Sequence, residues 1–365
     1  MSASDDPIEA VSQRLASFVT DQSTTWQHDG PEAAGFVRAG ADALTGGKRL
    51  RARFCLAGWQ AVAETRSPAE AASTPGDDVI AAAAALEIFH AAALVHDDLI
   101  DNSDTRRGRP AAHRALEAAH RAAGWAGDAE AFGRSGAILL GDLLVAWSDD
   151  LLEAGLRTAE HAAAAREVYA LMRREVTVGQ FLDIAEEAAF VTAPTDEHAA
   201  RALRVASLKS ARYSVQHPLL LGARLAGADA TQASALSAFG HPLGLAFQLR
   251  DDVLGVFGDS AVTGKPSGDD LREGKRTVLV AYAREAQNDS ERSAFDALLG
   301  DPTLDEEQIA GLQQIIRDTG ALDRVEELIT RTVADADAAL RDAPLGVEAT
   351  RWLRELAHDA TTRTA

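Results

Sequence analysis

Two groups of carboxylates in this chain stand beside apolar, helix-forming sequence. The first lies in the segment HDDLID over residues 96–101, and the second in the segment LRDD over residues 249–252. Carboxylates this close repel one another, and they are costly to bury unless a cation lies between them. Arginines or lysines follow both groups. The pattern predicts magnesium ions that bind a phosphorylated, largely apolar substrate.

The spacing within each group supports this hypothesis. On a helix, Asp97 and Asp101 are one turn apart and face the same way, so they can share magnesium ions that also bind phosphate oxygens. Gln248, Asp251 and Asp252 share a helix face by the same rule. Each group alone also fits a structural role. The first could be an acidic helix end neutralised by a basic loop, and the second a buried polar patch.

Aspartate pairs by themselves indicate little, because the chain has six of them. The pair at 149–150, with Glu153, repeats the one-turn spacing in an apolar setting, but no basic cluster follows it. We interpret that pair as structural. Most of the others are expected to be solvated surface or helix caps.

Composition excludes several classes of function. The 365 residues are 46% hydrophobic and only 5% aromatic, and the formal net charge is −20. Abundant alanine favours helix over strand. The acidic balance argues against nucleic acid and anionic membrane surfaces as partners. An anionic substrate must therefore be captured by local bases and metal.

The helical pattern predicts one all-α domain over residues 1–365, with flexible ends at roughly 1–6 and 356–365. The expected breaks are 65–78, 124–136, 191–197, 258–277 and 300–303. The break at 258–277 combines glycines and a proline with four bases, which is typical of a segment that covers phosphate.

The remaining sequence signals concern location. The single cysteine, Cys55, excludes an internal disulfide and fits a reducing cytoplasm. The acidic start of the chain is unlike a signal peptide. The best apolar run, 137–147, is interrupted by Asp142, so no run is expected to span a membrane. We expect a cytoplasmic protein without an integral membrane segment.

Short motifs follow one another in a specific order along the chain. They are GGKRLR (46–51), HDDLID with SDTRRG (96–108), GQFLD (179–183), KSARYS (209–214), FQLRDD (247–252) and VTGKPSGDDLREGKRT (262–277). Together they resemble the trans-isoprenyl diphosphate synthases, the polyprenyl synthetase family, and among them the geranylgeranyl diphosphate synthases. The resemblance implies an isoprenoid synthase bundle of long antiparallel helices around a deep central cavity. It also implies that the two aspartate motifs face each other across the cavity mouth, and that the protein is a homodimer.

The resemblance implies a reaction as well. An allylic diphosphate ionises, isopentenyl diphosphate attacks the cation, and loss of a proton leaves a chain longer by one five-carbon unit. The released pyrophosphate is the expected proton acceptor. The cofactor would be Mg²⁺, with Mn²⁺ as a possible substitute, because departure of pyrophosphate creates negative charge that a metal ion stabilises.

The same resemblance assigns roles to individual residues. The metal ligands would be Asp97, Asp101 and Asp251. The contacts to the allylic pyrophosphate would be Arg106, Lys209, Lys265 and Lys275. The metal-free isopentenyl diphosphate site would be Lys48, Arg51, His90 and Arg107. Ser210 and Gln248 would border the carbocation, and Gln180 and Asp183 would hold the metal site in place.

Three positions depart from the family pattern. Many members carry a third aspartate where Gly255 stands, so we expect slightly weaker metal binding without loss of activity. Ser210 replaces a more usual threonine and keeps the hydroxyl. Ala52 replaces a common proline, which affects geometry more than chemistry.

Product length depends on the helix that carries Asp97. Ala92 and Ala93, about one turn earlier, leave space where an aromatic ring would stop a C15 chain. Phe89 lies about 12 Å from Asp97 along the helix axis and is the first ring that could form a floor. We therefore predict the C20 product geranylgeranyl diphosphate, with a longer polyprenyl diphosphate (C25 or more) as the alternative.

Two other classes of protein remain open. A class I terpene cyclase shares the bundle and the ionisation step, but the bases of the second diphosphate site would be superfluous in it. A non-catalytic synthase subunit would normally have lost one aspartate motif. Incorporation of labelled isopentenyl diphosphate separates all three.

Overall fold

The computed structural model describes residues 6–66, 74–259 and 267–362. Within them the secondary structure is helical apart from one short two-stranded hairpin, which confirms the all-α prediction. Contacts divide the chain into two compact units. One is Met1–Ala164 with Leu221–Gly227, and the other is Ala165–Leu220 with Ala228–Ala365. The expectation of a single domain stays a prediction, and each unit is described by itself.

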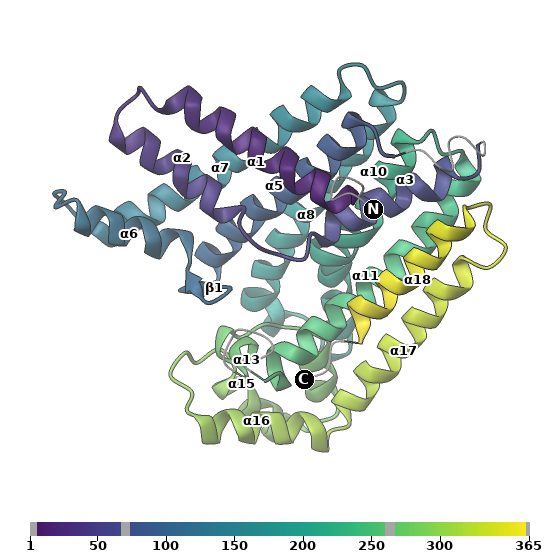
Figure 1. Ribbon diagram of the computed structural model, residues 1–365. Helices are drawn as coiled ribbons and strands as arrows, with labels where there is room; N and C mark the ends of the chain where they lie inside the picture. The colour runs from purple at the N-terminus through teal and green to yellow at the C-terminus, as the bar shows by residue number, and fades with distance from the viewer. Residues whose placement is uncertain (1–5, 67–73, 260–266, 363–365) are drawn as a thin grey trace. The chain divides into compact units, whose positions relative to one another are not determined.

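The first unit contains the N-terminal helices and a hairpin (Figure 1). Its elements are α1 (Pro7–Trp26), α2 (Pro31–Ala43), α3 (Leu50–Ala63), α5 (Asp77–Ile100), β1 (Thr105–Arg106), β2 (Arg109–Pro110), α6 (Ala112–Ala122) and α7 (Ala129–Leu156). Helix α7 begins inside the segment 124–136 that the sequence predicted to be a break, because Asp128 caps it by accepting hydrogen bonds from two backbone N–H groups.

Helix α5 is the core of this unit, and α1, α3 and α7 pack on it (Figure 1). The alanines at 81–85 in its N-terminal half are fully buried, and their small side chains let neighbouring helices approach closely. The helix is long and apolar enough to cross a membrane by length and composition, contrary to our expectation that no run would be. Of its apolar 18-residue stretch, 72% is buried inside the structure, which is typical of a core helix in a globular unit.

The second unit contains the remaining helices, and three of its described segments depart from regular α-helix. Its elements are α8 (Ala162–Ala189, which begins in the first unit), η1 (Phe190–Thr192), η2 (Thr195–Glu197), α9 (His198–Val205), η3 (Ala206–Gln216), α10 (His217–Leu225, which ends in the first unit), α11 (Ala230–Phe257), α13 (Asp269–Glu273), α14 (Val278–Glu285), α15 (Asp289–Leu298), α16 (Glu306–Asp318), α17 (Ala321–Ala339) and α18 (Val347–Thr361). The short η1 and η2 are 3₁₀-helices at the predicted break 191–197. Segment η3 is a π-helix of 11 residues.

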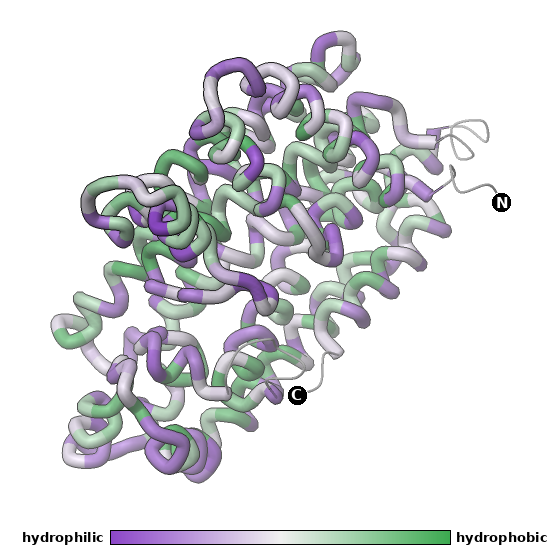
Figure 2. The backbone as a smooth tube through the Cα atoms, turned by 60° about the vertical axis from the view of Figure 1, so that its left-hand side comes forward, coloured by the Kyte–Doolittle hydropathy of each residue, from purple (hydrophilic) through white to green (hydrophobic). Residues whose placement is uncertain are grey.

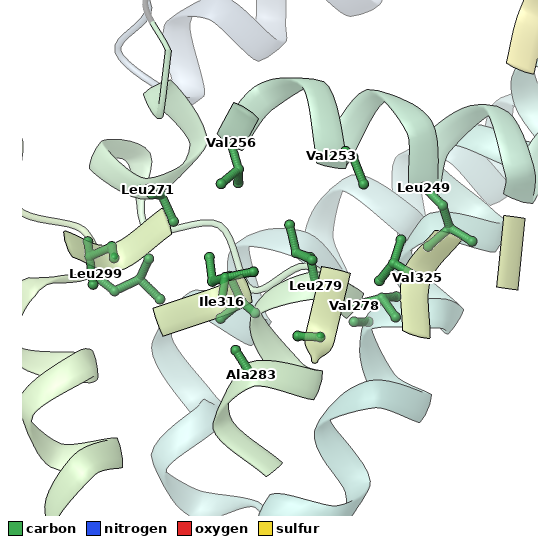
Figure 3. Packing of buried hydrophobic residues seen from close by; sticks show 14 of the residues in the cluster. Leu249, Val253, Val256, Leu271, Val278, Leu279, Ala283, Leu299, Ile316 and Val325 are labelled. Atoms are coloured by element: carbon green, nitrogen blue, oxygen red, sulfur yellow. The ribbon is translucent and has the colours of Figure 1, made fainter. Parts of the chain in front are cut away.

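A hydrophobic cluster holds the second unit together (Figure 3). Leu249, Val253 and Val256 project from α11 at helical spacing toward Leu279 and Val325 from α14 and α17. Hydrophobic and hydrophilic positions alternate along the helical tubes (Figure 2), which lets each helix bury one face. The cluster therefore fixes the face of α11 that carries the polar residues of the second motif.

The C-terminal end differs from the expectation of a flexible segment from residue 356. Helix α18 continues through Thr361 and lies beside α17 (Figure 1). Leu356, Ala360 and Thr361 are buried, and burial of this apolar face keeps the last helical turns ordered.

Candidate active site

The first aspartate motif forms the C-terminal end of α5. Asp97 and Asp98 lie in its last turn, and Asp101 caps it by donating its backbone N–H to the Asp97 carbonyl at 2.8 Å. A helix C-terminus carries partial negative charge and favours cations. The side chains of Asp97 and Asp101 therefore offer oxygen ligands in an environment that already attracts positive charge.

Arg106 is placed beside this motif by the β1–β2 hairpin. Its Nε donates to Asp98 Oδ1 at 2.9 Å, and one terminal nitrogen lies 4.0 Å from Asp97 Oδ2. Asp98 is 3% exposed, so its main role here is to hold the guanidinium of Arg106. Sequence reasoning predicted Arg106 as a phosphate contact but did not find this partner.

The carboxylates fit a magnesium ion whose remaining coordination positions are filled by substrate. Among the described residues, no three His, Cys, Asp or Glu side chains converge as a ready-made metal cage. Mg²⁺ is usually bound by one or two carboxylates, with waters and phosphate oxygens at its other positions. The one-turn pair Asp97 and Asp101 supplies that kind of donor set.

A second group of residues in the first unit is basic. His90, on α5 about two turns before Asp97, is half-buried among arginines from two other segments. Burial, and then the charges of Arg51, Arg107, Arg106 and Arg49, hold the pKa of His90 well below its usual value. A neutral imidazole among four guanidinium groups is the kind of environment that can bind a multiply charged anion.

Two glycines allow Arg107 to approach this group. Gly46 and Gly47 adopt φ of 75° and 90°, a left-handed region that favours glycine. A β-carbon at Gly47 would lie 3.0 Å from Nη2 of Arg107, and Nη1 of the same guanidinium donates to the Thr45 carbonyl at 3.1 Å. Lys48 follows the turn and is exposed. The structure therefore brings three of the four predicted isopentenyl-site residues together and leaves Lys48 at the solvent side of the same turn.

Two predicted residues of the allylic site, Lys209 and Ser210, lie in the second unit on the π-helix η3. Lys209 Nζ forms an ion pair with Asp183 Oδ2 of α8 at 2.5 Å, and Ser210 follows on the same helix. A β-carbon at Gly179 would overlap the Lys209 backbone, so the glycine of the GQFLD motif permits close packing of α8 on η3. π-helical segments are rare and frequently mark functional sites.

The second aspartate motif lies on α11. Gln248 Nε2 donates to Asp252 Oδ1 at 2.7 Å, which confirms that these two side chains share a face. Burial, and then the charge of Asp270, raises the pKa of Asp252 to about 8. The hydrogen bond from Gln248 opposes this shift, and the charge of Asp251 adds to it by a smaller amount. Asp251 is less buried than Asp252, so it is the member of the pair better placed to offer oxygens to a cation.

Helix α13 adds acidic residues that the sequence analysis did not assign. Lys275 Nζ lies 2.6 Å from Glu273 Oε2 and 3.5 Å from Asp270 Oδ1, so this predicted phosphate contact is held by two carboxylates. The predicted contact Lys265 lies outside the described residues.

The chain-length residues are all on α5. Ala92 is 1% exposed and Phe89 is 7% exposed, while Ala93 is partly buried. Their order along the helix is the predicted one, with Phe89 farthest from Asp97. Their effect on product length stays a prediction.

Comparison with known proteins agrees with these features. The polyprenyl synthetase family model matches residues 36–316. Geranylfarnesyl diphosphate synthase of Natronomonas pharaonis is 33% identical over 322 residues, 86% of this chain and 85% of that protein. Geranylgeranyl diphosphate synthase of Mycobacterium tuberculosis is 34% identical over 288 residues, 78% of this chain and 69% of that protein.

A solved structure extends the similarity to the whole fold. Geranylgeranyl pyrophosphate synthase of Corynebacterium glutamicum, in complex with isoprenyl diphosphate and magnesium, has a TM-score of 0.91 and 41% identity, covering 99% of each chain. The protein described here belongs to the polyprenyl synthetase family. It is a prenyltransferase with the all-α isoprenoid synthase fold.

Proposed function

We propose that this prenyltransferase condenses isopentenyl diphosphate with an allylic diphosphate and releases geranylgeranyl diphosphate. The observation that carries the proposal is the arginine-surrounded His90 in the same unit as the carboxylate end of α5. Arg106 belongs to both groups, since it bonds to Asp98 and its charge acts on His90. A site made of bases and a site where carboxylates would hold Mg²⁺ suit two diphosphates, of which only one leaves.

The two diphosphates differ in whether they leave. The allylic C–O bond breaks with its electron pair on pyrophosphate, and the double bond of isopentenyl diphosphate then attacks the allylic carbon. Mg²⁺ bound by Asp97, Asp101 and Asp251 would supply the charge stabilisation for the departing pyrophosphate. The diphosphate of isopentenyl diphosphate stays attached, so the bases around His90 are sufficient to hold it. Pyrophosphate is the proposed acceptor of the proton that is lost.

The residues of the second unit complete the proposal. Lys209 and Lys275 each have acidic partners that hold the ammonium group in one place, so they can bind the allylic pyrophosphate. Ser210 and Gln248 would border the carbocation with their oxygens, and Asp183, with Gln180 one turn earlier on α8, would orient Lys209. Lys265 is proposed as a further pyrophosphate contact on its motif alone.

Labelled isopentenyl diphosphate with farnesyl diphosphate and Mg²⁺ tests the proposal, with the extracted products separated by chain length. We expect a labelled C20 diphosphate as the main product. A C25 product is the second candidate, because the N. pharaonis relative is named a geranylfarnesyl diphosphate synthase. Cyclised hydrocarbon, or no incorporation by the metal-loaded protein, would contradict the proposal. Mn²⁺ is expected to replace Mg²⁺ in the same assay.

We also propose that the protein works as a homodimer in the cytoplasm. On α7, Phe132 and Leu139 are 37% and 60% exposed, and on α8, Val178 and Phe181 are 53% and 67% exposed. Exposed apolar side chains at helical spacing are typical of a surface that another subunit covers. Light scattering of Leu139→Glu and Phe181→Glu should show monomer, whereas the control Val347→Glu, at a 74% exposed position on α18, should remain dimeric.

A further inference from the structure

A buried carboxylate stands among the bases around His90. Glu87 lies on α5 one turn before His90 and is 6% exposed. Its Oε1 accepts a hydrogen bond from the backbone N–H of Ala52 at 3.0 Å, and its Oε2 lies 3.8 Å from Arg49 Nη1. Burial of a carboxylate is costly unless such partners are present. The assigned chemistry gives Glu87 no role, so its position requires another explanation.

The start of α3 lacks a cap of its own. Its N-cap residue is Arg49, which has a left-handed φ of 52° and makes no side-chain capping bond. Ala52 is the third residue of the helix, and its N–H is one that an N-cap side chain normally satisfies. Glu87 therefore performs the capping function from a different helix, and its negative charge suits the positive end of α3.

This cap controls the first turn of α3, which carries two of the arginines. Arg49 and Arg51 flank the first residue of the helix, and the charges of both act on His90. Burial, and then the charges of neighbouring arginines, lower the pKa of Arg107, and the charge of Glu87 opposes this shift. Glu87 thus contacts Arg49 and the first turn of α3, and its charge acts on Arg107 between β1 and β2. These segments must come together to bind an anion.

We propose that Glu87 is a positioning residue for diphosphate binding, whose hydrogen bond to Ala52 fixes the first turn of α3 and thereby places Arg49 and Arg51 around His90. The inference rests on the proposed function for the identity of the anion, which we take to be isopentenyl diphosphate.

Ala52 supplies the backbone N–H that Glu87 caps. The family pattern commonly has proline at this position, and proline has no N–H to donate. With alanine, the backbone can form the bond to Glu87. Alanine in place of proline at position 52 therefore adds a hydrogen bond in the proposed isopentenyl site, beyond its effect on backbone geometry.

Four variants of the full chain test the proposal: Glu87→Gln, Glu87→Ala, Ala52→Pro and the double variant Glu87→Ala/Ala52→Pro. The measurements are KM for isopentenyl diphosphate, KM for farnesyl diphosphate, kcat, and the Kd of inorganic pyrophosphate without metal. Glu117→Ala on α6 is the matched control, because Glu117 is equally buried at 6% exposure.

Glu87→Ala should raise the KM for isopentenyl diphosphate and the metal-free Kd for pyrophosphate about tenfold, the effect of losing one helix cap. The KM for farnesyl diphosphate and kcat should stay within about twofold, and Glu87→Gln should recover most of the loss because its amide oxygen still accepts the bond. Ala52→Pro should raise the same KM but add little in the Glu87→Ala background, since both remove one interaction.

Equal increases in both KM values, additive effects of the two changes, or unchanged constants in Ala52→Pro would overturn the proposal. If Glu87→Ala does not fold, Glu87→Gln and Ala52→Pro decide the question. Failure of the proposed function gives a different result, because the unaltered protein would then incorporate no isopentenyl diphosphate. The pyrophosphate measurement remains informative in that case.

Discussion

The carboxylate of Asp270 fills the space beside Gly255. A β-carbon added at Gly255 would lie closer than 3.0 Å to Cγ and both carboxylate oxygens of Asp270. Gly255 is the position at which many family members carry a third aspartate. Here α13 brings a third carboxylate to the second motif from a different part of the chain, and the glycine makes room for it.

Restoring the family residue should therefore weaken the protein. In Gly255→Asp, overpacking and repulsion between two carboxylates should lower the free energy of unfolding by about 1–3 kcal/mol. Urea unfolding measures this change. The double variant Gly255→Asp/Asp270→Ala should recover much of the loss, and a more stable Gly255→Asp protein would show that Asp270 moves away without cost.

The carboxylates of α5 should be essential for turnover. Asp97→Ala and Asp101→Ala should each lower kcat by on the order of 10³-fold or more, because charge stabilisation of the leaving group is the main source of catalysis. The control is Asp150→Asn on α7, which should keep normal kcat. Asp150 is the exposed member of the aspartate pair at 149–150 that was interpreted as structural. Near-normal turnover in an Asp97→Ala/Asp101→Ala double variant would refute the assigned metal site.

Substitution of Lys48 and substitution of Lys209 should affect the binding of different diphosphate substrates. Lys48→Ala should raise KM for isopentenyl diphosphate by about tenfold and leave KM for the allylic primer nearly unchanged, because the lost contact is to a group that never leaves. Lys209→Ala should affect the allylic substrate and kcat instead. Steady-state kinetics with each substrate varied in turn would show the difference, and equal effects of Lys48→Ala on both would mean that the sites are misassigned.

Product length should follow the wall of α5. Ala92→Phe should shorten the product toward C15, since a ring at this buried position occupies space that the growing chain needs. Phe89→Ala should lengthen it. Chromatography of labelled products measures both, and an active Ala92→Phe enzyme with an unchanged product distribution would show that the chain does not pass this face.

Acid should destabilise the second unit through His217. Burial is the larger effect and lowers the pKa of His217 below 6.5, although its hydrogen bond to Glu175 at 2.7 Å opposes this. Below that pH the unfolded chain binds more protons at this residue than the folded chain does, so the free energy of unfolding falls as the pH drops. Denaturation at about pH 7.5 and about pH 5.5 should show a smaller pH dependence in His217→Gln. An unchanged dependence would assign the acid sensitivity to other groups.

The sequence by itself determined the helical class, the family and the residue types of the site. Alanine-rich helical stretches and one-turn carboxylate spacing depend on interactions between near neighbours, so they can be read along the chain. The same holds for the Gly46–Gly47 turn, which needs the left-handed φ that glycine permits.

Only the tertiary structure decided which partner each charged group has. Asp98 holds Arg106, Asp183 holds Lys209, and Glu87 caps α3 from α5. These pairs join residues on different elements, and nothing in the local sequence specifies which acid will meet which base. Burial then sets their strength, because a charge removed from water depends on the few groups that the fold places beside it.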